Sequence, residues 1–280
     1  TRDAAPADAG PLLLDALART AGLAMERLAR EHLHARQQQI EDELRAARRV
    51  QQLITPPPSG ETCAFRYALR SDPGRFVAGD LVGVVPLGPR RAAAFLGDVS
   101  GKGMAASILM AATQSALQTS LQAGADVAAA VHSLNRHIAR ISAQSDFVTL
   151  VLLVADLDAN AVTILDAGHG YIAAFDARGN ARLLPCDGGI PVGIDDDCRY
   201  TTSTFPLDGL ERIVLFSDGV AERRSADAEQ FGVPRALDSL LRAPALGDDL
   251  AALFADVDAF AADSHFERDD TTAISLAFTR

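Results

Sequence analysis

Acidic residues stand beside hydrophobic runs at four places in the chain, where the pattern indicates the ends or starts of strands. Carboxylates placed in this way can bind a metal ion, and three of the four places carry a glycine that lets the backbone approach closely. A carboxylate near a core is costly to desolvate, so a cluster of them predicts a compensating cation. The residues concerned are Asp80, Asp98, Asp218 and the pair Asp269 and Asp270.

Oxygen ligands without His or Cys favour hard ions such as Mg²⁺ or Mn²⁺. Two such ions, bridged by a carboxylate, can position a water molecule and lower its pKa, which yields a hydroxide for in-line attack on a phosphoryl group. The alternative is that the aspartates are unrelated turn or capping residues, which is common for any one of them. The segment Gly97–Met104, taken alone, fits a capped strand-to-helix turn as well as a metal loop.

Other residues with reactive side chains support weaker interpretations. Lys102 lies in a short glycine-rich turn like that of a nucleotide-binding loop, but Gly103 stands where Ser or Thr is needed. His169, between two glycines, could contact substrate or metal, and a structural turn histidine is the favoured interpretation. His132 and His137 are five residues apart, a spacing that does not place them on one helix face.

Composition narrows the class of protein. A formal charge of −11 over 280 residues disfavours nucleic acid and anionic membranes as general partners. Cys63, Cys186 and Cys198 form no CxxC pair, which fits a reducing compartment and predicts a cytoplasmic protein. The longest apolar run, residues 147–155, is too short to span a membrane. No signal peptide is recognised, and a chain that opens on Thr1 suggests a fragment of a longer protein.

The N-terminal part predicts a linker and a long helix before one large domain. Residues 1–10 are expected to be a disordered linker. Residues 11–54 are expected to form a helix whose weak heptad seam indicates a dimerising coiled coil, and the alternative is a helix packed on its own domain. The proline-rich turn at residues 55–60 ends this helix, so that a domain of residues 60–280 follows.

Residues 60–280 predict an α+β domain of antiparallel sheets flanked by helices. Hairpin turns separate most strands, and the helices arrive in pairs, at residues 105–122 and 127–143 and again at 234–242 and 248–264. The runs at residues 200–205 and 211–217 are expected to form one strand pair. This order of elements excludes a doubly wound βαβ fold.

Four motifs, in order, resemble the bacterial SpoIIE/RsbU-type serine/threonine phosphatases of the metal-dependent PPM (type 2C) class. They are Gly97–Gly103, Ala167–His169, Phe216–Gly219 and Asp269–Thr272. The segment Arg48–Leu53 also resembles the family's lead into its catalytic domain. The resemblance implies an αββα sandwich of two antiparallel sheets with two Mn²⁺ or Mg²⁺ ions. It also implies hydrolysis of phosphoserine or phosphothreonine on a protein, typically a STAS-domain anti-sigma factor antagonist.

The resemblance assigns roles to individual residues. Asp98 would bridge the two ions, with the backbone carbonyl of Val99 beside it, and Asp80 would act on the second ion. Asp218 and Asp269 would hold the other ion. Asp269 is preferred over Asp270 because it follows an arginine, as the family's ligand does.

The family pattern is altered around the first aspartate. Ala78 stands in place of the first of two glycines, and Leu81-Val82-Gly83 stand where an aromatic pair and a second Asp are usual. These departures leave open a catalytically weak phosphatase-fold interaction module in a partner-switching pathway. A diguanylate cyclase, which Ala78-Gly79-Asp80 suggests, is a more distant alternative, because Leu81-Val82 stand where such a motif needs Glu-Phe. Our hypothesis is a phosphatase regulated through its N-terminal helix, with residues 105–122 as the moving element.

Overall fold

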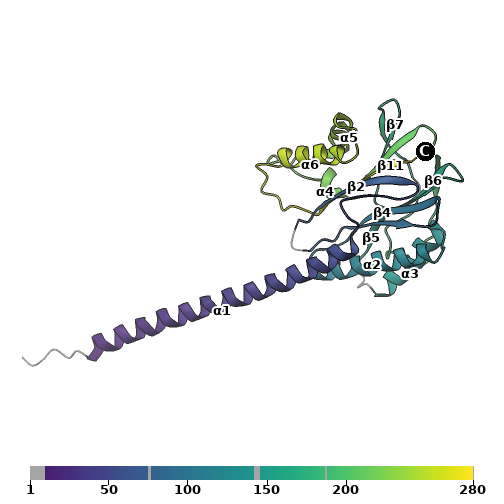
Figure 1. Cartoon of the computed structure of the whole chain (residues 1–280). Coiled ribbons are helices and arrows are strands. Elements are labelled where there is room, and N and C mark those ends of the chain that lie inside the picture. The colour runs from purple at the N-terminus through teal and green to yellow at the C-terminus, as the bar shows by residue number, and fades with distance from the viewer. Residues whose placement is uncertain (1–9, 75–76, 142–145, 187, 280) are drawn as a thin grey trace, which may run out of the picture. The chain divides into compact units, whose positions relative to one another are not determined.

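The computed structural model describes residues 10–74, 77–141, 146–186 and 188–279 (Figure 1). The predicted linker at residues 1–10 therefore lies outside the described residues except for Gly10, and so do positions 142 and 143 of a predicted helix. The chain divides into two compact units, one that ends at Ala47 and one that begins at Arg48. The second unit thus contains the last residues of the long helix as well as the predicted domain.

Helix α1 runs without interruption from Gly10 to Ile54 and confirms the predicted long helix. Positions 12–54 contain no proline and a single glycine, Gly22, so good helix formers occupy nearly every place. Ion pairs four residues apart, such as Arg27 to Glu31 at 2.9 Å, add small stabilising contributions. The helix ends just before three consecutive prolines, which lack the N–H that another turn would need.

Much of the apolar side-chain surface on α1 is exposed. The exposed fractions of Leu17, Leu28 and Leu33, three members of the predicted seam, are 57%, 63% and 69%. Ile54, at the end of the same seam, instead packs against the core of the second unit. No helix among the described residues is both long and apolar enough to cross a bilayer.

The second unit is a sandwich of two sheets in which every paired strand is antiparallel, as predicted. The six-stranded sheet has the order β1 (Ser59–Glu61), β2 (Phe65–Asp72), β11 (Thr271–Phe278), β10 (Leu210–Phe216), β7 (Ile172–Asp176) and β8 (Ala181–Leu183). The five-stranded sheet has the order β3 (Leu81–Pro86), β4 (Arg91–Val99), β5 (Val148–Asp156), β6 (Ala161–Ala167) and β9 (Ser203–Pro206).

Helices cover the outer face of each sheet, which completes the expected αββα architecture (Figure 1). Helices α2 (Met104–Gln122) and α3 (Val127–Ile141) pack on the five-stranded sheet. Helices α5 (Gly232–Arg242) and α6 (Asp248–Phe260) pack on the six-stranded sheet. A third cluster of buried side chains fills the space between the sheets. Three apolar layers therefore hold the sandwich together.

One predicted strand pairing is wrong. Strand β9 pairs with β6 in the five-stranded sheet, whereas β10 lies between β11 and β7 in the other sheet. Leu207, in the connection between β9 and β10, is buried among the residues that separate the two sheets. The turn at this place therefore carries the chain from one sheet to the other, and local alternation cannot reveal which strand becomes the neighbour.

A buried ion pair attaches α6 to the six-stranded sheet. Arg212 on β10 donates to Asp249 at 2.5 Å, and the guanidinium lies 4.2 Å from the centre of the Phe175 ring. Ser275 donates to the same carboxylate oxygen at 2.6 Å, and the backbone N–H groups of Gly247 and Leu250 donate to the other oxygen. Every oxygen of this buried carboxylate is thus supplied with donors.

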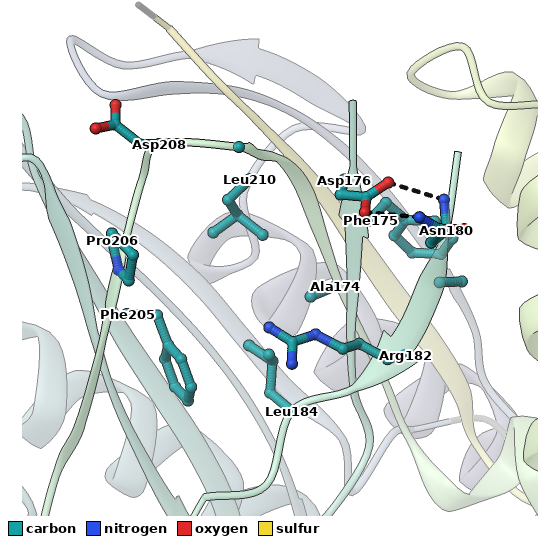
Figure 2. A pocket seen from close by; sticks show the side chains of 12 residues that line it. Ala174, Phe175, Asp176, Asn180, Arg182, Leu184, Phe205, Pro206, Asp208 and Leu210 are labelled. Carbon is teal, nitrogen blue, oxygen red and sulfur yellow. Dashed lines mark hydrogen bonds between the residues drawn. The ribbon is translucent and has the colours of Figure 1, made fainter. Parts of the chain in front are cut away.

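A cavity of about 420 Å³ opens between the edge strands β8 and β9 (Figure 2). Leu184, Phe205 and Leu210 form an apolar floor that is continuous with the core between the sheets. Leu210 begins β10, whereas the predicted ligand Asp218 follows the other end of that strand. This cavity contains none of the predicted site residues.

Candidate metal centre

Two of the predicted ligands come from one hairpin of the five-stranded sheet. Asp80 directly precedes β3 and Asp98 lies near the end of β4, and the ladder pairs Leu81 with Gly97, so the two adjacent aspartates lie together. A Cβ on Gly79 would lie 3.2 Å from Asp98 Oδ1, and one on Gly97 would lie 2.3 Å from a backbone oxygen of β5. Glycine at position 97 is therefore required for β4 to approach β5, whereas a side chain at position 79 would crowd the Asp98 carboxylate.

The other predicted ligands come from the neighbouring ends of β10 and β11. Asp218 is the first residue of the short helix α4 (Asp218–Ala221), which the sequence did not predict. Ser217 joins the two strands, because its N–H donates to the Thr272 carbonyl at 2.8 Å and its hydroxyl accepts the Thr272 N–H at 2.9 Å. A Cβ on Gly219 would lie 1.8 Å from the Asp270 carbonyl oxygen, so only glycine allows this approach.

The two consecutive aspartates before β11 have different surroundings. Asp270 accepts the backbone N–H of Gly74 at 2.8 Å on one oxygen and that of Gly79 at 2.5 Å on the other. Its carboxylate therefore holds the segment that leads to Asp80. Asp269 is exposed, and one of its oxygens accepts a hydrogen bond from the ammonium group of Lys102 at 3.3 Å. Asp269 thus has the oxygen atoms that are more accessible to an ion.

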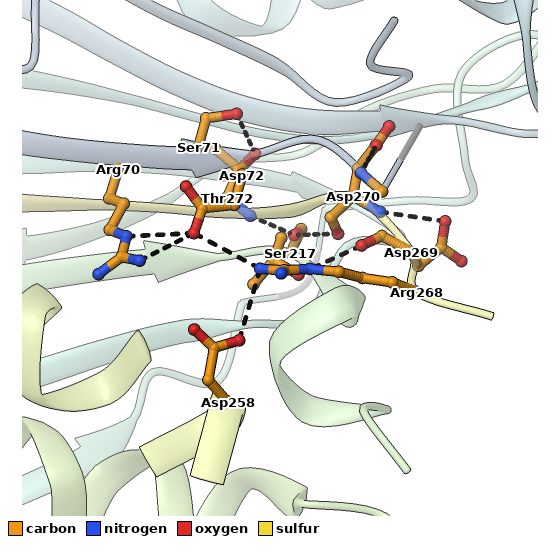
Figure 3. A network of polar contacts seen from close by, with 11 residues as sticks. Arg70, Ser71, Asp72, Ser217, Asp258, Arg268, Asp269, Asp270 and Thr272 are labelled. Carbon is orange, nitrogen blue, oxygen red and sulfur yellow. Dashed lines mark hydrogen bonds and ion pairs between the residues drawn. The ribbon is translucent and has the colours of Figure 1, made fainter. Parts of the chain in front are cut away.

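Ion pairs anchor the segment that carries these aspartates (Figure 3). The guanidinium of Arg268 lies 3.4 Å from Asp72 on β2 and 3.6 Å from Asp258 on α6. Arg70 donates to the same Asp72 oxygen at 2.9 Å. These contacts fix the chain immediately before Asp269 to the six-stranded sheet and its helix layer.

The site concentrates negative charge in partly buried surroundings. Burial, followed by the charge of Asp98, raises the pKa of the Asp80 carboxyl well above its usual value. Burial and then the charges of Asp218 and Asp269 raise the pKa of Asp98 to about 7. Burial, followed by the charges of Asp269 and Glu222, raises the pKa of Asp218 to about 6. The neighbouring carboxylates therefore disfavour the ionisation of Asp80, Asp98 and Asp218.

Asp80 is the most unusual member of the group. Its exposed fraction is 6%, and among the described residues neither carboxylate oxygen accepts a hydrogen bond of ordinary geometry; a weaker interaction with the Thr272 hydroxyl offsets only part of the rise in its pKa. A buried carboxylate without a donor is unfavourable unless a cation compensates it. The orphaned oxygens and the all-oxygen donor set fit a hard divalent ion. The residues present therefore suit Mg²⁺ or Mn²⁺ better than a softer metal.

Two cavities meet at Asp269. One, of about 110 Å³, is lined by Asp98 and Asp270 and by Lys102 at its edge. The other, of about 230 Å³, is lined by Asp218 together with Glu222, Arg223, Arg224, Phe266 and Glu267. Asp98, Asp218 and Asp269 are thus accessible from two sides, which leaves space for a phosphoryl group and for the chain that carries it. Asp80 instead lines a third cavity, of about 340 Å³, beside Gln51 and Ala78.

The predicted ligands form a wide arrangement. Within the described ranges, a single group of three acidic side chains has its carboxylate oxygens within 4.8 Å of one another. This group consists of Asp195, Asp196 and Asp197 and includes none of the predicted ligands. These three residues are exposed, lie between β8 and β9, and were not predicted as ligands. The spread of Asp80, Asp98, Asp218 and Asp269 over two sheets is larger than the coordination sphere of a single ion requires.

His169 is buried and has a structural environment, in agreement with the favoured interpretation. Its Nε2 lies 3.0 Å from the Phe216 carbonyl oxygen, and its Nδ1 lies 3.1 Å from the Thr149 hydroxyl. Burial lowers the pKa of the imidazole to about 4, so the ring is neutral near pH 7. Both nitrogens are engaged, and neither is free to bind a metal ion.

Two polar residues near the site were not identified from the sequence. Thr149 interrupts an apolar strand directly opposite Asp98, and this interruption was the available signal. The side chain of Gln51 at the end of α1 donates to the Ala78 carbonyl at 3.0 Å and accepts the Ala78 N–H at 3.2 Å. In the sequence, Gln51 lies in the segment Arg48–Leu53 that resembles the family's lead into its catalytic domain, and this resemblance was the available signal.

Comparisons with known proteins agree with this architecture. The family model described as Stage II sporulation protein E (SpoIIE) matches residues 88–279. Phosphoserine phosphatase RsbU of Bacillus subtilis is 26% identical over 204 residues, which cover 73% of this chain and 61% of that protein. The chain therefore spans about three fifths of the length of this curated relative.

Two solved structures share the fold. The SiaA-PP2C domain of Pseudomonas aeruginosa superposes with a TM-score of 0.73 at 22% identity and covers 87% of this chain and 98% of that one. RsbX in complex with magnesium superposes with a TM-score of 0.58 at 16% identity and covers 79% of this chain and 98% of that one. The family model covers more than half of the sequence and includes three of the predicted ligand positions, Asp98, Asp218 and Asp269. The chain therefore belongs to the SpoIIE family.

Proposed function

We propose that this chain is a metal-dependent protein serine/threonine phosphatase. The observation that carries the proposal is the buried carboxylate of Asp80, which lies beside Asp98 and accepts no hydrogen bond of ordinary geometry from the residues that the structure describes. In a site built for stability alone, such a carboxylate would be supplied with donors, as Asp249 is. The relative RsbU is named a phosphoserine phosphatase, and RsbX binds magnesium in its solved structure.

The predicted ligands can be assigned to two Mn²⁺ or Mg²⁺ ions. Asp98 would bridge the ions, with the Val99 carbonyl beside it, and Asp80 would act on one of them. Asp218 and Asp269 would hold the other. We assign Asp269 rather than Asp270 because Asp269 is exposed and its hydrogen bonds, from the Asp270 N–H at 3.2 Å and Lys102 at 3.3 Å, are longer than those of Asp270 at 2.8 Å and 2.5 Å. Bound ions would supply positive charge and lower the pKa of a bound water.

The carboxylates also orient the reacting groups. Asp98 lies on β4 and Asp218 follows β10 of the other sheet, so the two would act on a phosphoryl group from different directions. Lys102 at the edge of the same cavity adds a cation that attracts the phosphoryl group of the substrate. We propose a phosphorylated STAS-domain protein as the substrate and a cytoplasmic location, which the small number of cysteines and the lack of a CxxC pair support.

We further propose that α1 regulates the site and forms a homodimer. Gln51 pairs with both backbone groups of Ala78, two residues before Asp80, and Gln114 of α2 donates to the Ile54 carbonyl at 2.6 Å. The end of α1 is thus bonded to the Asp80 segment and to the predicted moving helix. Weaker Mn²⁺ binding by Gln51→Ala would support this regulation, and unchanged binding would contradict it.

Dimerisation through α1 follows from its uncovered seam. Leu17 and Leu28 are exposed at the spacing of a coiled coil, Leu33 is exposed after a five-residue break in that seam, and burying such side chains is favourable. Sedimentation equilibrium should therefore give twice the monomer mass, and a monomer at all accessible concentrations would exclude this arrangement. A triple substitution of these leucines by glutamate should release the monomer.

The phosphatase proposal is tested with two ligand variants and a matched acidic control. Asp98→Ala and Asp218→Ala should abolish Mn²⁺-dependent phosphate release from p-nitrophenyl phosphate and from a phosphoserine peptide. Asp196→Ala removes an exposed carboxylate from the other acidic group and should retain full activity. Full activity in both ligand variants would contradict the proposed mechanism. Mn²⁺ binding without turnover would instead favour the alternative of a non-catalytic interaction module.

A further inference from the structure

His169 occupies a rigid turn between β6 and β7. Gly168 and Gly170 on either side have φ values of +73° and +81°, a region that glycine adopts without strain. The Asp166 carboxylate accepts the N–H of His169 at 2.7 Å and that of Gly170 at 3.0 Å. The ring also packs edge-on against Tyr171, with 5.9 Å between the ring centres. The imidazole is therefore held in one orientation.

The two ring nitrogens contact different sheets. Nε2 contacts the carbonyl of Phe216 at the end of β10, in the six-stranded sheet, and Nδ1 contacts the hydroxyl of Thr149 on β5, in the five-stranded sheet. A carbonyl oxygen can only accept, so Nε2 carries the proton and donates it. Nδ1 then accepts the hydrogen of the Thr149 hydroxyl. The ring is thus a directional link across the sandwich.

Each contact of His169 adjoins a strand that carries a predicted ligand. Thr149 is the ladder partner of Asp98, and its hydroxyl lies 3.5 Å from the Asp98 carbonyl oxygen. Phe216 lies two residues before Asp218. The link therefore joins β5, the strand beside Asp98, to β10, the strand that leads to Asp218, without contact to either carboxylate.

We propose that His169 is a positioning residue, which sets the separation of the two sheets so that Asp98 and Asp218 can bind the same pair of divalent cations. This inference rests on the proposed metal-dependent function and deepens it. It assigns the histidine neither to metal ligation nor to proton transfer, because both of its nitrogens are occupied by the protein.

The physical need for such a link arises from the forces at this end of the sandwich. Packing between the sheets is apolar and non-directional, so by itself it does not set the distance between two strand ends. Asp98 and Asp218 repel each other before an ion binds. A metal site tolerates errors of only about 0.2 Å in its ligand distances. Two hydrogen bonds from a rigid ring oppose this repulsion and fix the gap.

The test measures Mn²⁺ binding by calorimetry on the full chain. His169→Ala removes both contacts, and Thr149→Val removes one contact with little change in shape. Loss of a residue that orients a ligand typically weakens metal binding about 10- to 100-fold. We expect a loss in this range for His169→Ala and a smaller loss for Thr149→Val. In the double variant the losses should be less than additive, because both substitutions break the same link.

The matched control is Asn135→Ala. Asn135 is a buried polar residue on α3 that makes three hydrogen bonds, to the Asp195 carbonyl, the Gly193 N–H and the Tyr200 hydroxyl. Its loss should lower Tm but leave the affinity for Mn²⁺ unchanged. His169→Gln should recover part of the affinity, because its amide can donate to the Phe216 carbonyl and accept from Thr149.

The outcomes separate this inference from the phosphatase proposal. If the wild-type chain binds no Mn²⁺, both are overturned. If the wild type binds Mn²⁺ and releases phosphate while folded His169→Ala and Thr149→Val bind it equally well, only the role of His169 is overturned. Equal losses of affinity in Asn135→Ala and His169→Ala would show a general effect of stability and would also overturn it.

Discussion

Asp249 and Asp80 are two buried aspartates of this domain with opposite surroundings. Asp249 has an exposed fraction of 0% and receives hydrogen bonds from Arg212, Ser275 and two backbone N–H groups. Asp80 has an exposed fraction of 6% and lies near Asp98, a further carboxylate, and within the described part of the chain its oxygens accept no hydrogen bond of ordinary geometry, with only a weaker interaction from the Thr272 hydroxyl. Burial is nearly equal, and the supply of donors and positive charge is what differs.

This difference separates a residue that stabilises the fold from one that is available for chemistry. A buried carboxylate with a full set of donors is stable without any ligand. A carboxylate without donors, surrounded by others, stores unfavourable energy that a bound cation can relieve. Active sites commonly sacrifice stability in this way. The comparison predicts that the same substitution should have opposite effects at the two positions.

The largest effect is expected for Asp249→Leu. Removal of this carboxylate leaves the Arg212 guanidinium buried and unpaired, and breaking a buried pair in this way costs about 3–5 kcal/mol. Urea unfolding in the presence of EDTA should show this decrease in the free energy of unfolding. The double variant Arg212→Met/Asp249→Leu should recover much of it, because no uncompensated charge remains. A loss below about 1 kcal/mol would contradict the importance of the pair.

The opposite sign is expected for Asp80→Leu. An apolar side chain of similar shape removes two orphaned oxygens and one member of the carboxylate group, so the metal-free chain should become more stable by about 1–2 kcal/mol. The same urea experiment in EDTA measures this. In Mn²⁺ the variant should lose the stabilisation that the wild type gains from the ion. Destabilisation of the metal-free chain would show that Asp80 contributes to the fold after all.

The smallest effect is the pH dependence of the metal-free chain. The pKa values of Asp98 and Asp218 are about 7 and about 6 in the folded state, above the unfolded value of 3.8. Between pH 3.8 and about 7 the folded chain therefore holds more protons on these two carboxyl groups than the unfolded chain does. Their contribution to stability falls as the pH rises over that interval and is lost above about pH 7. Melting in EDTA should give a higher Tm at about pH 5 than at about pH 8.

Excess Mn²⁺ should reverse this trend. An ion binds the deprotonated carboxylates, so protons compete with it and the stabilisation by metal grows as pH rises. The difference in Tm between Mn²⁺ and EDTA should therefore increase from about pH 5 to about pH 8. A difference that is independent of pH would argue against binding at these aspartates.

Local signals in the sequence were sufficient for much of the fold. The absence of proline and the near absence of glycine predicted α1, and the β3–β4 hairpin, whose register depends on residues close in sequence, brings Asp80 beside Asp98. The alternation of short strands with pairs of helices predicted the antiparallel sandwich. The metal roles of Asp80, Asp98, Asp218 and Asp269 came from motifs and remain predictions.

Contacts between distant segments were decided only by the tertiary structure. The sequence could not show that β9 and β10 join different sheets, nor that Asp270 accepts N–H groups from residues almost 200 positions away. It also could not show that Gln51 pairs with Ala78 or that His169 joins two sheets. Periodicity reports which face of an element is apolar, because that depends on neighbours in the chain. Which carboxylate is satisfied and which is left for an ion depends on donors that only folding brings close.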